Sequence, residues 1–447
     1  MGLIAFCLQS LCRVHPSVLR TAHTMAVTML VLGLNLGTGV ITARFLGPDG
    51  RGEQAAIGFW ALPIVMLFSC GLPTASIYFM RSRKDELHLT CTSIYVLAVV
   101  LGIIAAPTGA LSMPFLVGNF GPEVVSSAQL LMAFVPFSML YMISLCVIRA
   151  HDDFAGFNLF RVIQPALTLL MLFGLVAGER LTPLTAAATY PLSGALLLPW
   201  FLPRTWRYAR PKLAGVWAQI WVQMKKLMHY GLRAHGIDIV NVLGNIIDSV
   251  IVIGMLPAEA VGYYTVAKGV AQSLQQTGGV IALVILPNIA EKQLQRAVEL
   301  SMVAGRFAFW SMLLVGAILL LLAPPLLKIM FGEEFMPAVD VFRLLVSATV
   351  VRIFTETLMQ AFIATGRPGS MSVLQMISLA AAIGLLFLLV PVYGGMGAAY
   401  TMLGVALFRM FGVLACFPLI LKTGLPSLLI RAEDLRMLRR PSRLPPL

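Results

Sequence analysis

Charged residues are scarce in this chain. Only 11% of its 447 residues are Asp, Glu, Lys or Arg, whereas 59% are hydrophobic. Soluble globular domains have about 25% charged residues, and disordered chains are poor in hydrophobic ones. The composition therefore excludes both classes and predicts a polytopic membrane protein.

Cysteine and histidine are also few, with six residues of each. Four of the cysteines lie inside apolar runs, where a thiol packs as a small hydrophobic side chain, so no disulfide framework is predicted. No two histidines have the spacing of metal ligands with an acid in support, and no GxSxG, Walker or HExxH motif occurs. We therefore expect no metal site, no cofactor and no enzymatic activity.

Long apolar runs make up most of the chain. A transmembrane helix needs about 20 largely apolar residues, and by this criterion the sequence contains twelve candidate spans separated by short polar gaps. The predicted spans are 24–46, 55–80, 89–117, 128–150, 159–178, 184–203, 232–254, 261–290, 304–331, 339–365, 370–393 and 396–422. The sequence thus predicts an all-α polytopic fold.

Lysine and arginine are divided unequally between alternate gaps. One set of gaps, which includes both termini, contains 24 of the 32 Lys and Arg residues, whereas the opposite set contains only Arg51, Arg180 and Lys328. Positive residues are retained in the cytoplasm, so both termini are predicted to be cytoplasmic. The net charge of +13 is then a topology signal, and no nucleic acid partner is predicted because the basic residues are not clustered with aromatic ones.

The longest gap divides the spans into six and six. We predict a cytoplasmic N-terminal segment (1–23), a first six-helix lobe (24–203), a cytoplasmic linker (204–231), a second six-helix lobe (232–422) and a basic cytoplasmic tail (423–447). A faint repeat supports this division, because Pro48 and Gly52 after the first span correspond to Pro257 and Gly262 after the seventh. An even number of spans per half predicts parallel repeats around a central cleft.

The linker itself is predicted to contain a helix. Hydrophobic residues recur there at helical spacing, with Trp217 and Trp221 among them and Lys225 and Lys226 nearby. Two interpretations are open: an amphipathic helix on the inner leaflet, or aromatic residues that cap the seventh span at the membrane interface. Both place the linker in the cytoplasm.

Polar side chains share helix faces within three of the predicted spans. Charged groups at this depth are costly and usually face a bundle interior or a water-filled cavity. The spacing confines the polar residues of the seventh span to a stripe about 80° wide, which predicts an aqueous cleft, although interhelical hydrogen bonds are the alternative. The stripes are Asp238, Asn241, Asn245 and Asp248 on the seventh span, Tyr264, Lys268, Gln272 and Gln275 on the eighth, and Thr24, Thr28, Asn35, Thr38 and Thr42 on the first.

Arginines extend this predicted site. Arg352 and Glu356 are i, i+4 neighbours that can pair, Arg409 has no acid within reach on its own helix, and Arg44 ends the first span. Because guanidinium groups bind phosphate oxygens bidentately, a positive cleft with amide groups suits an anionic head group that carries sugars. The candidate substrate-binding residues are Arg44, Asn241, Asn245, Tyr264, Lys268, Gln272, Gln275, Arg352 and Arg409, and the candidates for ion coupling are Asp238, Asp248 and Glu356.

Four stretches of sequence together resemble a known family. They are 42–53 (TARFLGPDGRGE), 260–267 (AVGYYTVA) with Leu286 and Pro287, 331–335 (FGEEF), and 366–368 (GRP) followed by 391–399 (PVYGGMGAA). In this order they extend over nearly the whole chain. The chain resembles the Wzx-type polysaccharide and O-antigen flippases of the multidrug and oligosaccharidyl-lipid exporter superfamily, which includes the MATE transporters.

The resemblance implies twelve to fourteen helices in two lobes around a cationic cavity. It also implies alternating-access transport of a polyprenyl-pyrophosphate-linked oligosaccharide across the bacterial inner membrane, for lipopolysaccharide or exopolysaccharide biosynthesis. The expected partners are this substrate, membrane lipids, and, as candidate protein partners, a polysaccharide polymerase and other biosynthetic proteins.

Three alternatives differ in chemistry. A cation-coupled multidrug or small-solute exporter of the same superfamily would prefer acidic residues in its cavity, and a lipid II flippase would move a related substrate. A membrane glycosyltransferase, ligase or polymerase needs a sizeable polar loop on the outer face, whereas the predicted outer gaps are short.

Overall fold

The computed structural model describes residues 16–82, 84–209, 217–285, 294–365 and 367–421, and these residues form helices and short connections without any strand. The helices of the first half are α2 (Pro16–Phe59), α3 (Ala61–Phe68), α4 (Leu72–Ser82), α5 (Leu87–Leu116), α6 (Pro122–Leu131), α7 (Val135–Ala150), α8 (Phe154–Ala177) and α9 (Pro183–Ala209). Those of the second half are α10 (Trp217–Met255), α11 (Ala258–Ile285), α12 (Leu294–Leu321), α13 (Ala323–Phe331), α14 (Ala338–Ala364) and α15 (Pro368–Cys416). Single turns are η1 (Lys84–Glu86), η2 (Gly118–Phe120), η3 (Met132–Phe134), η5 (Glu333–Phe335) and η6 (Phe417–Leu421).

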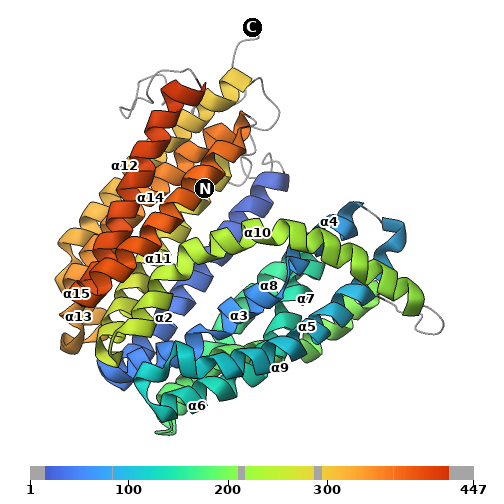
Figure 1. Cartoon of the computed structure of the whole chain (residues 1–447), viewed down its shortest axis with the longest axis horizontal. Helices are drawn as coiled ribbons and strands as arrows, with labels where there is room; N and C mark the ends of the chain where they lie inside the picture. The colour runs from blue at the N-terminus through green and yellow to red at the C-terminus, as the bar shows by residue number, and fades with distance from the viewer. Residues whose placement is uncertain (1–15, 83, 210–216, 286–293, 366, 422–447) are drawn as a thin grey trace, which may run out of the picture.

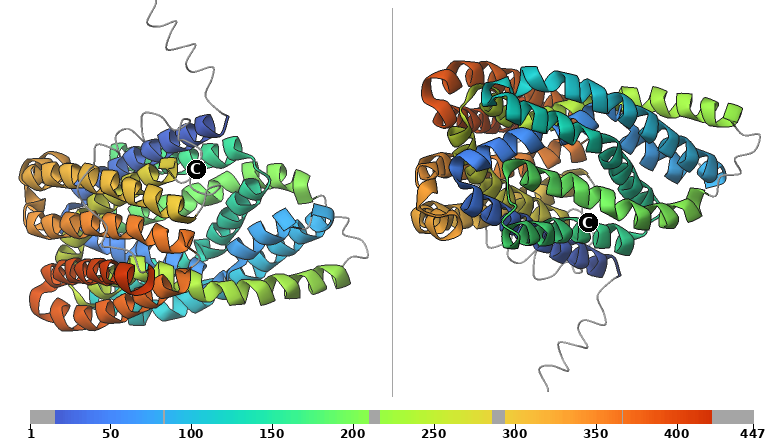
Figure 2. Two further views of the ribbon diagram at one scale, coloured as in Figure 1. Left: turned by 90° about the horizontal axis from the view of Figure 1, so that it is seen from above. Right: turned by 90° about the horizontal axis from the view of Figure 1, so that it is seen from below.

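The helices are arranged in two bundles that diverge from a common end (Figure 1). Helices α3–α9 lie in one bundle and α11–α15 in the other, and the perpendicular views keep the two halves on opposite sides of the molecule (Figure 2). Helix α2 packs on both α8 and α11, and α10 packs on both α5 and α15. These two helices therefore connect the bundles.

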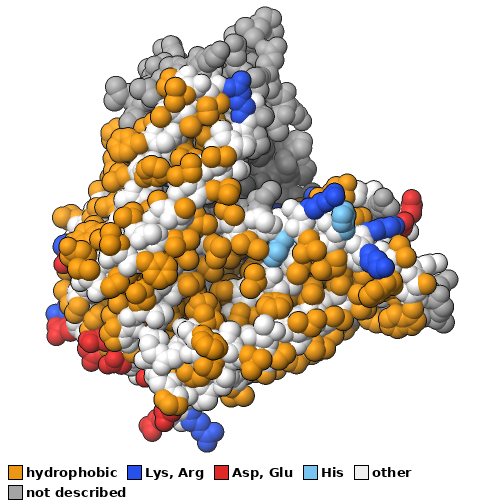
Figure 3. All heavy atoms as spheres, in the orientation of Figure 1, with side chains coloured by type: hydrophobic (Ala, Val, Ile, Leu, Met, Phe, Trp, Pro, Cys, Tyr) orange, Lys and Arg blue, Asp and Glu red, His pale blue; other side chains and the backbone are white. Residues whose placement is uncertain are grey.

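Several helices are long and apolar enough to cross a membrane. Among the described residues these are His23–Phe68, Leu87–Leu116, Pro122–Ala150, Phe154–Ala177 and Gly369–Leu421, and the bent pair Phe309–Leu321 and Ala323–Phe331 adds a sixth. Hydrophobic side chains cover both bundles on the face shown in Figure 3. An outward-facing apolar surface of this extent suits lipid rather than water, so the chain is an all-α multi-pass membrane protein, as predicted.

Two of the predicted gaps between spans coincide with glycines that interrupt long helices, α2 and α15. Gly47 interrupts α2 with φ 67° and ψ −178°, and Gly394 interrupts α15 with φ 58° and ψ −137°. Residues with a side chain rarely adopt positive φ, whereas glycine does so readily. Each of these two helices therefore consists of two segments. The segments of α15 match the eleventh and twelfth predicted spans. The first segment of α2 matches the first predicted span, whereas its second segment is only the start of the second predicted span, which continues through α3 and α4.

The predicted linker helix is part of α10 and is continuous with the seventh predicted span. Its first turns contain the exposed residues Trp217 and Trp221, and the ammonium group of Lys225 lies over the Trp221 ring at 5.4 Å. The amide of Gln223 donates to Thr90 on α5 at 2.9 Å. The N-terminal half of α10 thus packs on the first bundle, and residues 210–216 lie outside the described part of the chain.

The bundles meet where α2 crosses α11. A Cβ atom added at Gly52 would overlap the carbonyl oxygen of Ala258, and one added at Gly262 would overlap that of Pro48. Both positions therefore require glycine. They are also the two glycines that the sequence repeat places in correspondence, so each half supplies one glycine to a reciprocal contact at the common end.

Candidate functional site

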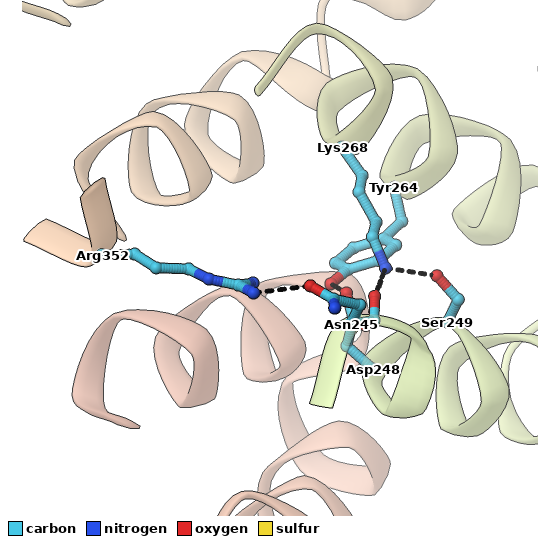
Figure 4. Close-up of polar contacts among 6 residues, drawn as sticks. All are labelled: Asn245, Asp248, Ser249, Tyr264, Lys268 and Arg352. Atoms are coloured by element: carbon cyan, nitrogen blue, oxygen red, sulfur yellow. Dashed lines mark hydrogen bonds and ion pairs between the residues drawn. The ribbon is translucent and has the colours of Figure 1, made fainter. Parts of the chain in front are cut away.

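Polar residues predicted on two different spans converge on Lys268 of α11 (Figure 4). Its ammonium group donates to Oδ1 of Asp248 at 2.7 Å, to Oγ of Ser249 at 2.7 Å and to the carbonyl oxygen of Asn245 at 3.2 Å. The Tyr264 hydroxyl donates to Oδ2 of Asp248 at 2.5 Å. Because Tyr264 and Lys268 are four residues apart, they lie on one face of α11 and approach α10 together.

Asp248 is the most deeply buried acid of this group, with 3% of its surface exposed. A carboxylate at such a position is tolerated when a cation and further hydrogen bonds satisfy both oxygens, and Lys268 and Tyr264 meet that requirement. Asp248 therefore holds α10 and α11 together at membrane depth.

Arg352 of α14 brings a third helix to the site. Its Nη2 donates to Oδ1 of Asn245 at 2.5 Å, and its Nε donates to Oε1 of Glu356 at 2.8 Å. The predicted i, i+4 pair is formed, and it reaches across to α10. A cavity of about 70 Å³ is lined by Asn245, Asp248, Lys268, Gln272, Gln275 and Arg352, together with apolar neighbours.

Arg409 of α15 lines a neighbouring cavity of about 50 Å³, and Arg352 lines both cavities. The Nε of Arg409 is buried and has no hydrogen-bond partner within the described part of the chain. We call Asn245, Asp248, Lys268, Arg352, Glu356 and Arg409 the second-half site. Its three cations outnumber its two carboxylates.

Three predicted residues are not brought to this site by any described contact. Arg44 donates from Nε to the carbonyl oxygen of Met330 at 2.9 Å and from Nη2 to that of Ile329. It thus caps the C-terminal carbonyls of α13, which have no partner within their own helix. The side chains of Asp238 and Asn241 lie outside the described part of the structure.

A larger cavity lies mainly among helices of the first half, α2, α3, α7, α8 and α9, and extends to α10 and α11. It has a volume of about 610 Å³, and Asn35, Thr38 and Thr42 of the predicted polar stripe line it. Arg51, which belongs to the gap after the first predicted span, and Arg161, near the start of the fifth predicted span, also line it. Arg161, Gln164 and Thr168 share a helix face, and this spacing is the signal that could have revealed the cavity. We call this space the first-half cavity.

The first-half cavity and the second-half site are adjacent. Ser249 and Thr265 line the first-half cavity, whereas Lys268, which donates to Ser249, lines the second-half site. Lys268 and its partners therefore lie at the boundary between the two spaces. Among the described residues no cluster of three His, Cys, Asp or Glu side chains could hold a metal ion.

Comparison with known proteins identifies one matching family. The model of a family described as polysaccharide biosynthesis protein matches residues 19–293, which include α2 to α11. No curated protein sequence gives a significant match.

Solved structures of transporters share the architecture. The lipid II flippase MurJ in an inward closed conformation has a TM-score of 0.71 at 13% identity, over 93% of this chain and 89% of that one. An inward-facing multidrug resistance MATE family transporter of the MOP superfamily has a TM-score of 0.64 at 16% identity, over 89% and 96%. A MOP superfamily transporter from Pyrococcus furiosus has a TM-score of 0.55 at 16% identity, over 90% and 93%. The chain therefore has the fold of these transporters.

Proposed function

Because this chain belongs to the polysaccharide biosynthesis protein family, we propose that it is a flippase for a polyprenyl-pyrophosphate-linked oligosaccharide. It would work by alternating access in the bacterial inner membrane, with twelve spans and both termini in the cytoplasm, and supply a surface polysaccharide such as O-antigen or exopolysaccharide. The observation that carries this proposal is the convergence of Lys268, Arg352 and Arg409 on two adjoining cavities inside a membrane-spanning bundle.

The second-half site suits the diphosphate of the carrier lipid. Arg352 and Arg409 offer guanidinium forks and Lys268 an ammonium group, and such groups form strong charge-assisted hydrogen bonds to phosphate oxygens. Asp248 and Glu356 pair with two of these cations, Lys268 and Arg352. A bound diphosphate would replace these carboxylates as the partner of the cations, while Asn245, Gln272 and Gln275 bind sugar hydroxyls.

Displacement of the carboxylates from their cations would couple substrate binding to the binding of a proton or a sodium ion. A buried carboxylate that loses its cation is unstable as an anion, so Asp248 or Glu356 would take up a proton or a sodium ion when the diphosphate arrives. We assign ion coupling to these two residues, and to Asp238 on the strength of its sequence position alone.

Alternating access would use the common end as one gate. The bundles touch there through Gly52 and Gly262 and diverge toward the other end (Figure 1). The distribution of Lys and Arg assigns the diverging end to the cytoplasm. The structure then corresponds to a state that receives substrate from the cytoplasmic side, and separation of α2 from α11 would release it outside.

The basic character of both cavities favours this proposal over a multidrug exporter. The second-half site has three cations against two carboxylates, and the described lining of the first-half cavity has two arginines and no acid. Organic cations would be repelled from such sites. Lipid II also carries a diphosphate, so the charge of the cavities does not distinguish a lipid II flippase from an oligosaccharide flippase. An experiment has to separate these two functions.

A deletion strain of the source bacterium tests the proposal. Its lipids would be extracted and polyprenyl-pyrophosphate oligosaccharides quantified by mass spectrometry, with surface polysaccharide measured in parallel. We expect a complete repeat unit to accumulate and the surface polymer to disappear. Accumulation of lipid II would favour the peptidoglycan precursor instead, and normal lipids and polymer in a strain without a redundant flippase would contradict both.

Variants of the second-half site extend this test. Arg352→Ala and Arg409→Ala should each abolish surface polysaccharide while the protein stays in the membrane. Arg343→Ala is the matched control, because Arg343 pairs with Asp340 at an exposed position away from the cavities. Full activity of both cavity variants would contradict the role of the cations.

A further inference from the structure

The first-half cavity has a lining that suits a carbohydrate. Its volume of about 610 Å³ far exceeds that of the cavities in the second-half site. Amides and hydroxyls from six helices, α2, α7, α8, α9, α10 and α11, line it, and they are interleaved with aromatic side chains. The polar and aromatic lining residues used in this argument are Asn35, Gln54, Phe59, Tyr141, Gln164 and Tyr190.

The charge in this cavity is uncompensated. Arg51 and Arg161 line it, and no Asp or Glu is among its described lining residues. Arg51 donates from Nη1 to the neutral Oε1 of Gln54 at 2.5 Å, and its Nε is buried without a hydrogen-bond partner among the described residues. Arg161 lies over the ring of Phe157 at 5.4 Å. In the second-half site, by contrast, Lys268 and Arg352 each have a carboxylate partner.

A partly buried cation without a counterion is costly. The cost falls when an anion enters, because opposite charges attract strongly in surroundings of low dielectric constant. The two arginines therefore give the cavity a net positive charge, and an anionic ligand would neutralise it.

The two arginines lie at opposite ends of the cavity. Gly37 of α2 is level with Leu169 of α8, and Gly50 is level with Pro183 at the start of α9. Arg161 lies eight residues before Leu169 on α8, whereas Arg51 follows Gly50. Pro183 follows the end of α8 at Ala177 after a short connection. Because 16 residues separate Arg161 from Ala177, Arg161 lies roughly 24 Å along α8 from the end that is near Arg51, at about 1.5 Å per residue. This separation suits an elongated ligand with charge at more than one point, rather than a single diphosphate group.

We infer that the first-half cavity binds an acidic glycan, with Arg51 and Arg161 as its carboxylate-binding residues. The amides and hydroxyls bind sugar hydroxyls, and the rings of Tyr141 and Tyr190 offer apolar faces to sugar rings. This inference rests on the proposed function. It assigns the diphosphate and the sugars next to it to the second-half site, and the more distant, acidic part of the glycan to the first-half cavity. Ser249, which lies at the boundary between the two, places them next to each other.

Binding of soluble probes to the purified full chain in lipid nanodiscs tests this inference. Isothermal titration calorimetry would compare trigalacturonate, maltotriose as a neutral trisaccharide, and inorganic pyrophosphate. The variants are Arg51→Gln and Arg161→Gln in the first-half cavity, Arg352→Gln in the second-half site, and Arg343→Gln as the exposed control.

We expect trigalacturonate to bind more tightly than maltotriose. Arg51→Gln and Arg161→Gln should each weaken trigalacturonate binding roughly tenfold to hundredfold, the loss expected for one charge-assisted hydrogen bond. Arg352→Gln and Arg343→Gln should leave it unchanged. Pyrophosphate binding should show the reverse pattern, weakened by Arg352→Gln and not by Arg51→Gln.

Two results would overturn the inference: equal affinity for the acidic and neutral trisaccharides, or loss of pyrophosphate rather than trigalacturonate binding in the Arg51 and Arg161 variants. If instead Arg352→Gln leaves pyrophosphate binding unchanged while the trigalacturonate pattern holds, the diphosphate assignment fails and the glycan site stands.

Thermal unfolding would report whether each variant is folded. Should the glutamine variants not fold, Arg51→Lys and Arg161→Lys should keep the preference for the acidic trisaccharide, and salt should weaken trigalacturonate but not maltotriose binding to the unaltered chain; failure of either expectation also overturns it.

Discussion

Asp248 accepts a hydrogen bond on each carboxylate oxygen, from Tyr264 and from Lys268. Helical periodicity in the sequence placed the two donors on one face and the acid on another helix, and the structure brings the two faces together. Arg409 differs, because its buried Nε has no partner within the described part of the chain. At the scale of residues, the second-half site thus combines two ion pairs, Asp248 with Lys268 and Glu356 with Arg352, with one guanidinium whose Nε has no partner among the described residues.

Removal of the buried acid should destabilise the protein. Asp248→Ala leaves the Lys268 ammonium without its counterion and the Tyr264 hydroxyl without its acceptor, so we expect a loss of roughly 3 kcal/mol in the free energy of unfolding. Asp248→Ala with Lys268→Met should recover about 2 kcal/mol of this loss. With the single variant Lys268→Met included, the double-mutant cycle should give a coupling energy of at least about 2 kcal/mol. Unfolding in mixed detergent micelles would measure each variant.

The exposed pair Asp340 and Arg343 serves as the control for this cycle. Because solvent screens an exposed ion pair, its coupling energy should be below about 1 kcal/mol. Equal coupling energies for the two pairs would contradict the structural role of Asp248.

Glycines control how helices begin, break and cross. Gly47 and Gly394 adopt positive φ where the chain passes between two predicted spans, and the breaks were recognisable from the sequence as turn patterns. Gly52 and Gly262 act differently, since they allow the backbones of α2 and α11 to touch. Their correspondence in the repeat was visible in the sequence, whereas their mutual contact was not. At the scale of elements, close approach at the common end depends on these two residues.

Introducing even a small side chain at Gly52 or Gly262 should push the two bundles apart. Gly52→Ala and Gly262→Ala each place a methyl group against a backbone carbonyl, which cannot move as a side chain can, so we expect a loss of about 1–3 kcal/mol in stability and a lower midpoint of thermal unfolding. Gly254→Ala is the matched control, because a Cβ there meets open space. A melting temperature as high as that of the control would show that the contact is not required.

The whole molecule consists of two bundles joined at one end. The resemblance to polysaccharide flippases of the exporter superfamily is confirmed at the level of family and fold, by the match over residues 19–293 and by the shared architecture of MurJ and MATE transporters. Family and fold together support a transporter rather than an enzyme, as predicted. The orientation in the membrane follows only from the distribution of Lys and Arg and stays a prediction.

Cysteine labelling would test this orientation. In a chain with its six cysteines replaced, Glu333→Cys near the common end should react with a membrane-impermeant maleimide in cells with a permeabilised outer membrane and an intact inner membrane. Asp85→Cys at the other end should react only after the inner membrane is opened. Both residues are exposed, so access to the reagent depends on the side of the membrane, and the opposite pattern would reverse the predicted topology.

Composition, apolar run length and helical periodicity were sufficient to predict an all-α membrane protein, the breaks near Gly47 and Gly394, and the shared faces of Tyr264 with Lys268 and of Arg352 with Glu356. These properties are local, because each depends on residues within one or two helical turns of each other. The tertiary structure decided which faces meet. It brought Arg352 to Asn245, 107 positions away in sequence, and placed Arg44 at the end of α13. It also placed Arg51 and Arg161 in the lining of the first-half cavity. Such contacts depend on how whole helices cross and pack, and no local spacing encodes that geometry.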